Sequence, residues 1–444
     1  MFILFILYFL KVFHLFSSNI VIPFITVKEN FTTDGYSSTF MYHNFPNKIE
    51  TKMKIGTPGQ EISLRIKTFQ YPISINSVQM EIYKVIQFNE SDSSTYIPLN
   101  ERPTYFGEND FSTAIKSLDT INFNNISMKN FTFLLGITQN ENHRESGVLG
   151  LKIPEFDWRI NNVSFIKQLK ERELIHKYNF YIQYNDNDDN GNLVIGSLPH
   201  ENDPQKYNKD KYDEFYATIV MSSLGLRVKK AFYGDEVIDY GFNVELAVED
   251  NFIKGNNNFK NILMKNYFQR YFDRRICQSS KFSYLDNRDN EFFYCSKKLN
   301  LSEFKNIILS IDNSELTIEL NYNDLFYEYE DYYYFLMYFP NKTYSTNFFR
   351  FGKALFKKYA IIFNYDSKMI GYYKEDKKET NGNQNIDQNE KLNYNFVPWI
   401  IIIILVLIVL GLVFYILYYK PCNIRAKRAN ELKDDDYTYQ GINE

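Results

Sequence analysis

The chain has no strong excess of charge of either sign. Its 444 residues include 50 Lys and Arg against 54 Asp and Glu, for a formal net charge of −4. Because no basic field is available to attract a polyanion, we expect no nucleic-acid partner. The chain has only 3 cysteines. His143, His176 and His200 show neither metal-ligand nor catalytic-triad spacing. We therefore expect no metal site and no cofactor.

Glycine is also sparse, at 18 residues, whereas Tyr and Phe number 37 and 40. Aromatic residues favour strands, but a compositionally biased genome produces the same excess, and composition leaves both explanations open. Between residues 35 and 373, however, short runs of strand-forming residues alternate with Asn, Asp, Gly and Pro. This pattern predicts a mostly antiparallel β protein. Helical periodicity occurs at residues 164–175 and 259–275.

Two long apolar runs predict the compartment. Residues 1–18 resemble a secretory signal peptide, although no basic residue precedes the apolar run. Residues 397–418 carry no charged side chain and would form about 33 Å of helix, enough to cross a bilayer. Basic residues begin at Lys420, so the tail at 419–444 is expected in the cytoplasm and the preceding part in a lumen or outside the cell. We expect a single-pass membrane protein of the secretory or endolysosomal pathway or the cell surface.

Several features before the span agree with that topology. Residues 374–396 are too polar to fold and predict a disordered stalk. Cys277 and Cys295 would form a disulfide in an oxidising lumen, which leaves Cys422 as a reduced thiol beside the membrane. In the tail, Tyr439, Gln440, Gly441 and Ile442 have the form that endocytic sorting adaptors recognise. Candidate glycosylation sites occur at Asn30, Asn89, Asn125, Asn130, Asn162, Asn300 and Asn341.

Residues 55–69 read IGTPGQEISLRIKTF. This stretch resembles the N-terminal active-site motif of pepsin-like aspartic peptidases, in which IGTP-x-Q leads into Asp-Thr-Gly. The resemblance implies an all-β, two-lobed fold with few short helices, with one lobe at 35–200 and the other at 201–373. Further segments resemble the family in the same order along the chain: SDSSTYIPL at 91–99, SGVLGL at 146–151, GNLVIGSLPH at 191–200 and FGKALFKKYAIIFNYDSKMIGYY at 351–373.

Both catalytic aspartates implied by the resemblance are replaced. Lys67 stands at the first aspartate and is followed by Thr68, with Phe69 at the glycine. Aligning Gly255 with the last glycine of the second motif places Ala247 at the other aspartate. The flap of the family would correspond to Tyr105 and Gly107.

Without the aspartates, the family's chemistry has no acid and base. Two adjacent carboxylates must share one proton, so that one activates water while the other donates to the substrate carbonyl. A charged lysine has donors but no acceptor, and alanine has neither. Glu249 and Asp250 follow the second position, but a shift along a tight loop would re-aim a side chain, and we judge rescue by these acids unfavourable. Phe69 and Glu249 would also add bulk to the cleft.

The sequence therefore predicts a pseudo-peptidase that binds a peptide or protein in a retained cleft. Family membership alone would instead imply an active, membrane-tethered aspartic endopeptidase. A structural surface glycoprotein without a functional cleft is the third alternative. An open cleft with apolar pockets would favour the binding protein over the structural one.

Overall fold

The computed structural model describes most of the chain before the predicted stalk. The described residues all belong to one compact unit, Met1–Asp376. No helix among the described residues is long and apolar enough to cross a membrane. The predicted signal, span, tail and sorting motif lie outside those residues, as does the predicted stalk beyond Lys374. The described residues are 19–28, 47–68, 73–78, 86–99, 113–138, 146–152, 163–185, 190–220, 223–284, 288–340 and 348–374.

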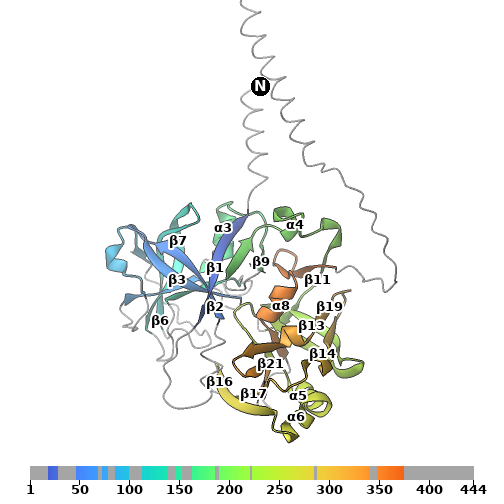
Figure 1. The fold of residues 1–444 in the computed structure, drawn as a ribbon. Coiled ribbons are helices and arrows are strands. Elements are labelled where there is room, and N and C mark those ends of the chain that lie inside the picture. The colour runs from blue at the N-terminus through green and yellow to red at the C-terminus, as the bar shows by residue number, and fades with distance from the viewer. Residues whose placement is uncertain are drawn as a thin grey trace, which may run out of the picture. The chain divides into compact units, whose positions relative to one another are not determined.

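Strands dominate these residues and form two sheets (Figure 1). The first sheet has the order β11-β24-β23-β9-β10-β1-β2-β3-β8-β4-β7-β6-β5. It recruits three strands from beyond residue 200, so the two halves of the chain are joined by backbone pairing. Its strands are β1 (Ile20–Lys28), β2 (Asn47–Ile55), β3 (Gln60–Lys67), β4 (Ile73–Asn76), β5 (Ile97–Pro98), β6 (Thr113–Phe123), β7 (Ile126–Thr138), β8 (Gly147–Gly150), β9 (Asn179–Tyr184), β10 (Asn190–Ile195), β11 (Tyr212–Tyr216), β23 (Ile362–Asn364) and β24 (Met369–Tyr373).

The second sheet is built from the middle of the chain. Its order is β16-β17-β21-β15-β22-β14-β13-β18-β19, with β12 beside β13 and β20 beside β21. Its strands are β12 (Thr218–Val220), β13 (Ser223–Tyr233), β14 (Glu236–Leu246), β15 (Ile253–Lys254), β16 (Cys277–Tyr284), β17 (Arg288–Ser296), β18 (Ile307–Ile311), β19 (Thr317–Leu320), β20 (Phe326–Tyr329), β21 (Tyr332–Pro340) and β22 (Phe348–Phe351). The all-β prediction is confirmed.

Both predicted helices are present. The first is α3 (Phe165–Glu171), whose apolar residues are buried. The second is interrupted: α5 (Asn257–Leu263), a π-helical turn (Met264–Phe268) and α6 (Gln269–Asp273) follow one another. Asn256 starts α5 because its side chain accepts the amide hydrogen of Phe259. The remaining helical turns are short: η2 (Glu90–Asp92), α4 (Pro199–Asn202), η4 (Lys209–Lys211), η6 (Leu301–Glu303), α7 (Tyr322–Leu325) and α8 (Lys353–Lys358).

The aromatic excess of the sequence is used in the interior. Phe268, for example, is fully buried and has ring centroids 5.0 Å from Phe293 and 5.1 Å from Phe335. Such edge-to-face contacts add specificity to the area that large rings bury. One continuous core of Ile, Leu and Phe side chains runs through both sheets.

The predicted disulfide between Cys277 and Cys295 is confirmed. The two residues pair directly across β16 and β17, with Cα atoms 3.9 Å apart, and both side chains are buried. The bridge therefore closes the open end of this hairpin.

Candidate functional site

Two of the motifs that carried the resemblance contact one another. Gly56 adopts a φ of +87° in the turn between β2 and β3, where a side chain would also strike Ser93. The backbone amide of Ser94 donates to the carbonyl of Thr57 at 2.8 Å. Asp119 accepts hydrogen bonds from the hydroxyls of Ser93 and Thr95. The turn that begins β3 is thus fixed by the Ser-rich segment.

Strand β3 ends at Lys67, which is buried with 8% of its surface exposed. Strand β3 pairs with β8 in parallel, and the amide of Leu151 donates to the carbonyl of Lys67 at 2.9 Å. Thr68 follows and is fully buried. Phe69, Tyr105 and Gly107 lie outside the described residues.

The second loop follows β14. Ala247 is fully buried, and its amide donates to the carbonyl of Phe351 in β22 at 2.9 Å. The chain then turns, because the amide of Asp250 donates to the carbonyl of Ala247 at 3.1 Å. Gly352 packs against this turn so closely that a Cβ there would lie 1.8 Å from the carbonyl oxygen of Asp250. The segment after β22 can therefore pack against the turn after β14 only with a glycine at position 352.

The loops after β3 and β14 meet through side chains. The hydroxyl of Thr68 lies 2.7 Å from Oε2 of Glu249 and 3.2 Å from the carbonyl oxygen of Leu246. The amide of Thr68 donates to the same carboxyl group, at 3.2 Å and 3.1 Å from its two oxygens. Glu249 thus fills the junction between the two sheets.

Glu249 is 5% exposed, and its environment disfavours a negative charge. Burial raises the pKa of Glu249 to about 7, and the nearby charge of Asp250 adds to the rise, whereas the hydrogen bonds from Thr68 oppose it. This carboxyl group therefore titrates near neutrality.

A buried ion triad lies beside the same loop. Glu245 and Arg350 are partners in the parallel β14–β22 pairing, and their side chains approach to 2.7 Å. Arg350 also lies 3.3 Å from Asp250. Burial of Arg350 works against its charge, but the carboxylates of Asp250 and Glu245 outweigh it and raise the pKa of the guanidinium. Asp250 and Glu245 are therefore joined through one arginine.

Sequence reasoning missed this triad and the Thr68–Glu249 contact. Glu245 and Arg350 each interrupt an apolar strand, in NVELAV and FFRFG. An isolated charge in a buried strand needs a partner, so the two interruptions could have been paired. The contact of Glu249 with Thr68 leaves no comparable signal in the sequence.

Four candidate glycosylation sites fall on described residues. Asn125, Asn130 and Asn300 are exposed and Asn89 is half-buried. Asn30, Asn162 and Asn341 lie outside the described residues. Within the described part of the chain, no three His, Cys, Asp or Glu side chains are grouped so as to hold a metal ion.

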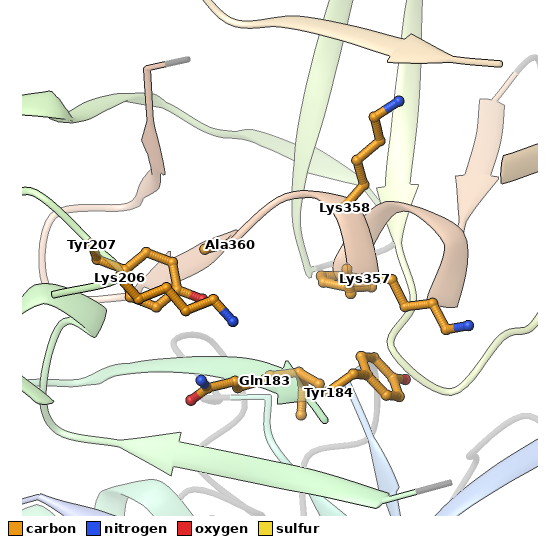
Figure 2. Close-up of a pocket in the computed structure, with 9 residues that line it drawn as sticks. Gln183, Tyr184, Lys206, Tyr207, Lys357, Lys358 and Ala360 are labelled. Carbon is orange, nitrogen blue, oxygen red and sulfur yellow. The ribbon is translucent and has the colours of Figure 1, made fainter. Parts of the chain in front are cut away.

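A separate cavity of about 130 Å³ lies between β9, the segment after α4 and the end of α8 (Figure 2). Lys206, Lys357 and Lys358 contribute to its wall, and Lys358 is already paired with Asp324 at 2.8 Å. None of the residues that the sequence analysis assigns to a site lines this cavity.

The described residues thus form a mostly β protein of two sheets whose strand-end loops meet at a buried junction. The chain belongs to the eukaryotic aspartyl protease family, whose profile matches residues 49–374. This match confirms the family and the pepsin-like fold predicted from the motifs. A comparison with the curated proteins found no match.

Proposed function

We propose that the protein is a non-catalytic member of this family, a pseudo-peptidase that binds a peptide or protein while anchored in a membrane. The proposal rests on the contacts that the carboxyl groups at the junction make. Glu249 accepts hydrogen bonds from Thr68, and Asp250 and Glu245 both form ion pairs with Arg350. Lys67 and Ala247 are the positions aligned with the catalytic aspartates, and neither side chain supplies a carboxyl group to share a proton over a water molecule.

Aromatic side chains beside this loop support a binding role over a purely structural one. Phe252, two residues beyond Asp250, packs against a cluster of Phe292, Tyr334 and Tyr338. The cluster continues into a row that crosses three strands, because Tyr327 and Tyr294 are both strand partners of Tyr334. Tyr327 is 39% exposed and Tyr332 is 37% exposed. Such surfaces suit apolar and aromatic side chains of a ligand.

The alternative remains an active, membrane-tethered aspartic endopeptidase, which membership of the family favours. It would require that other acids supply the dyad. Lys67 and Ala247 would then not occupy the catalytic positions.

The test compares two peptides of equal length, one plain and one with a hydroxyl that mimics the tetrahedral intermediate. Such an analogue gains affinity through the catalytic carboxyl groups, because it is complementary to the transition state. We expect equal affinities for this protein, and no cleavage of denatured globin between about pH 3 and 7. Selective binding of the hydroxyl analogue by about 100-fold or more, or cleavage that it inhibits, would establish the active enzyme instead.

The membrane topology is part of the proposal, with the described domain in a lumen or outside the cell and residues 419–444 in the cytoplasm. It rests on the apolar segment at 397–418 and the basic residues after it. An antibody against residues 434–444 should label cells only after permeabilisation. Labelling of intact cells would reverse the orientation.

A further inference from the structure

The hydroxyl of Thr68 faces two acceptors but has only one proton to donate. Oε2 of Glu249 lies 2.7 Å from the hydroxyl oxygen, and the carbonyl oxygen of Leu246 lies 3.2 Å from it. If Glu249 is ionised, its oxygens can only accept, so the hydroxyl can donate to one of the two acceptors and the other O···O contact holds no hydrogen. All three groups are buried, where a lost hydrogen bond is costly.

A proton on Glu249 resolves this conflict. The acid then donates from Oε2 to the hydroxyl oxygen of Thr68, whose own proton goes to the carbonyl of Leu246. The amide of Thr68 continues to donate to the other carboxyl oxygen, at 3.2 Å. Both O···O contacts of the hydroxyl hold a hydrogen only in this state.

The charged groups around the contact come from four elements. Asp250 lies on the same loop as Glu249, and Glu245 and Arg350 lie on β14 and β22. With both acids ionised, these three groups carry a net charge of one negative unit, which disfavours a further negative charge on Glu249. The positive groups nearby in the chain are Lys67, which directly precedes Thr68, and Lys353, whose amide donates to the carbonyl of Asp250 and whose ammonium lies 5.3 Å from the ring centre of Tyr184.

We propose that Thr68 and Glu249 form a proton-operated clasp between the two sheets, closed in acid and loosened when Glu249 loses its proton. Thr68 follows β3 of the first sheet and Glu249 follows β14 of the second, so the clasp controls how firmly the two are held together. The raised pKa of Glu249, about 7, places the transition near neutrality. The clasp needs no ligand, so its test is independent of the proposed binding function.

Hydrogen exchange of the full-length protein in detergent micelles tests the clasp. The readout is protection of the Thr68 amide, followed by mass spectrometry in peptides that cover residues 60–68 and corrected for the intrinsic effect of pH. We expect protection to fall about tenfold or more between pH 5.5 and 8.5 as the carboxyl group ionises. In Glu249→Gln, the amide side chain donates to the Thr68 hydroxyl and accepts from its amide, so protection should stay high at both pH values.

Three further variants separate the clasp from general effects of pH. Thr68→Ser keeps the hydroxyl and should keep the response, whereas Thr68→Val removes it and should show low protection throughout. Glu61→Gln changes an exposed acid paired with Lys52 and should behave as the wild type. A pH response in Glu249→Gln equal to that of the wild type, or no response in the wild type, overturns the proposal. If Glu249→Gln does not fold, an unchanged response in Thr68→Val overturns it.

Discussion

Replacing Arg350 by methionine should lower the free energy of unfolding by about 3–5 kcal/mol. The guanidinium is 11% exposed and lies between Glu245, at 1%, and Asp250, at 4%. Methionine restores most of the volume but removes the cation between two buried carboxylates. Much of the loss is the cost of keeping those charges buried after the arginine is removed, rather than the net contribution of the ion pairs. Urea unfolding of the full-length protein in detergent measures this loss of unfolding free energy.

Two further variants test whether burial of the charges causes the loss of stability in Arg350→Met. Arg227→Met removes an arginine that is 59% exposed and pairs with Asp312 at 3.6 Å, so its loss should stay below about 1 kcal/mol. Adding Glu245→Gln and Asp250→Asn to Arg350→Met neutralises the stranded carboxylates and should recover more than half of the loss. A loss below about 1 kcal/mol in Arg350→Met itself would mean that water reaches the triad and that the charges are not effectively buried.

The strands and helices could be predicted because their signals are local. The strand-forming runs expected between residues 35 and 373 include β7 (Ile126–Thr138), and the amphipathic stretch at 164–175 contains α3 (Phe165–Glu171). The sequence pattern missed the break in the second helix, where a π-helical turn (Met264–Phe268) separates α5 from α6. It also assigned no strand before residue 35, although β1 begins at Ile20 and pairs with β2 and β10.

The candidate site was predictable only in part, because its contacts join distant segments. Resemblance located Lys67 and Ala247, and the loops that follow β3 and β14 do meet. The partners of the nearby acids could not be predicted from spacing. Thr68 hydrogen-bonds Glu249, and Arg350 pairs with Asp250. That outcome depends on the parallel pairing of β14 and β22, which connects residues about a hundred positions apart.

The junction therefore uses its carboxyl groups for structure. The sequence resemblance aligns Glu249 with a glycine of the family's motif, and its side chain hydrogen-bonds Thr68 of the opposite loop. A carboxyl group buried in this way resists ionisation. The stability of the folded protein should therefore depend on the protonation of this group.

The wild-type protein should lose stability as pH rises through neutrality, and Glu249→Gln should not. The pKa of Glu249 is raised from 4.5 to about 7 by burial and by the charge of Asp250. A group whose pKa is raised on folding binds its proton more tightly in the folded state. Its contribution is therefore fully present below about pH 4.5 and is lost as pH rises through about 7. A shift of this size corresponds to about 3 kcal/mol.

The measurement is the difference in unfolding free energy between wild type and Glu249→Gln at pH 5 and at pH 8. Other groups also titrate in this window, among them His200, whose pKa is lowered by burial, but they are common to both proteins and cancel in the difference. The two proteins should be similar at pH 5, where the wild-type carboxyl group is neutral like the amide. At pH 8 the wild type should be less stable by about 2–3 kcal/mol, because folding then keeps a carboxylate in a buried site. Equal differences at the two pH values would show that Glu249 ionises as freely in the folded protein as in the unfolded chain, and that its burial carries no proton linkage.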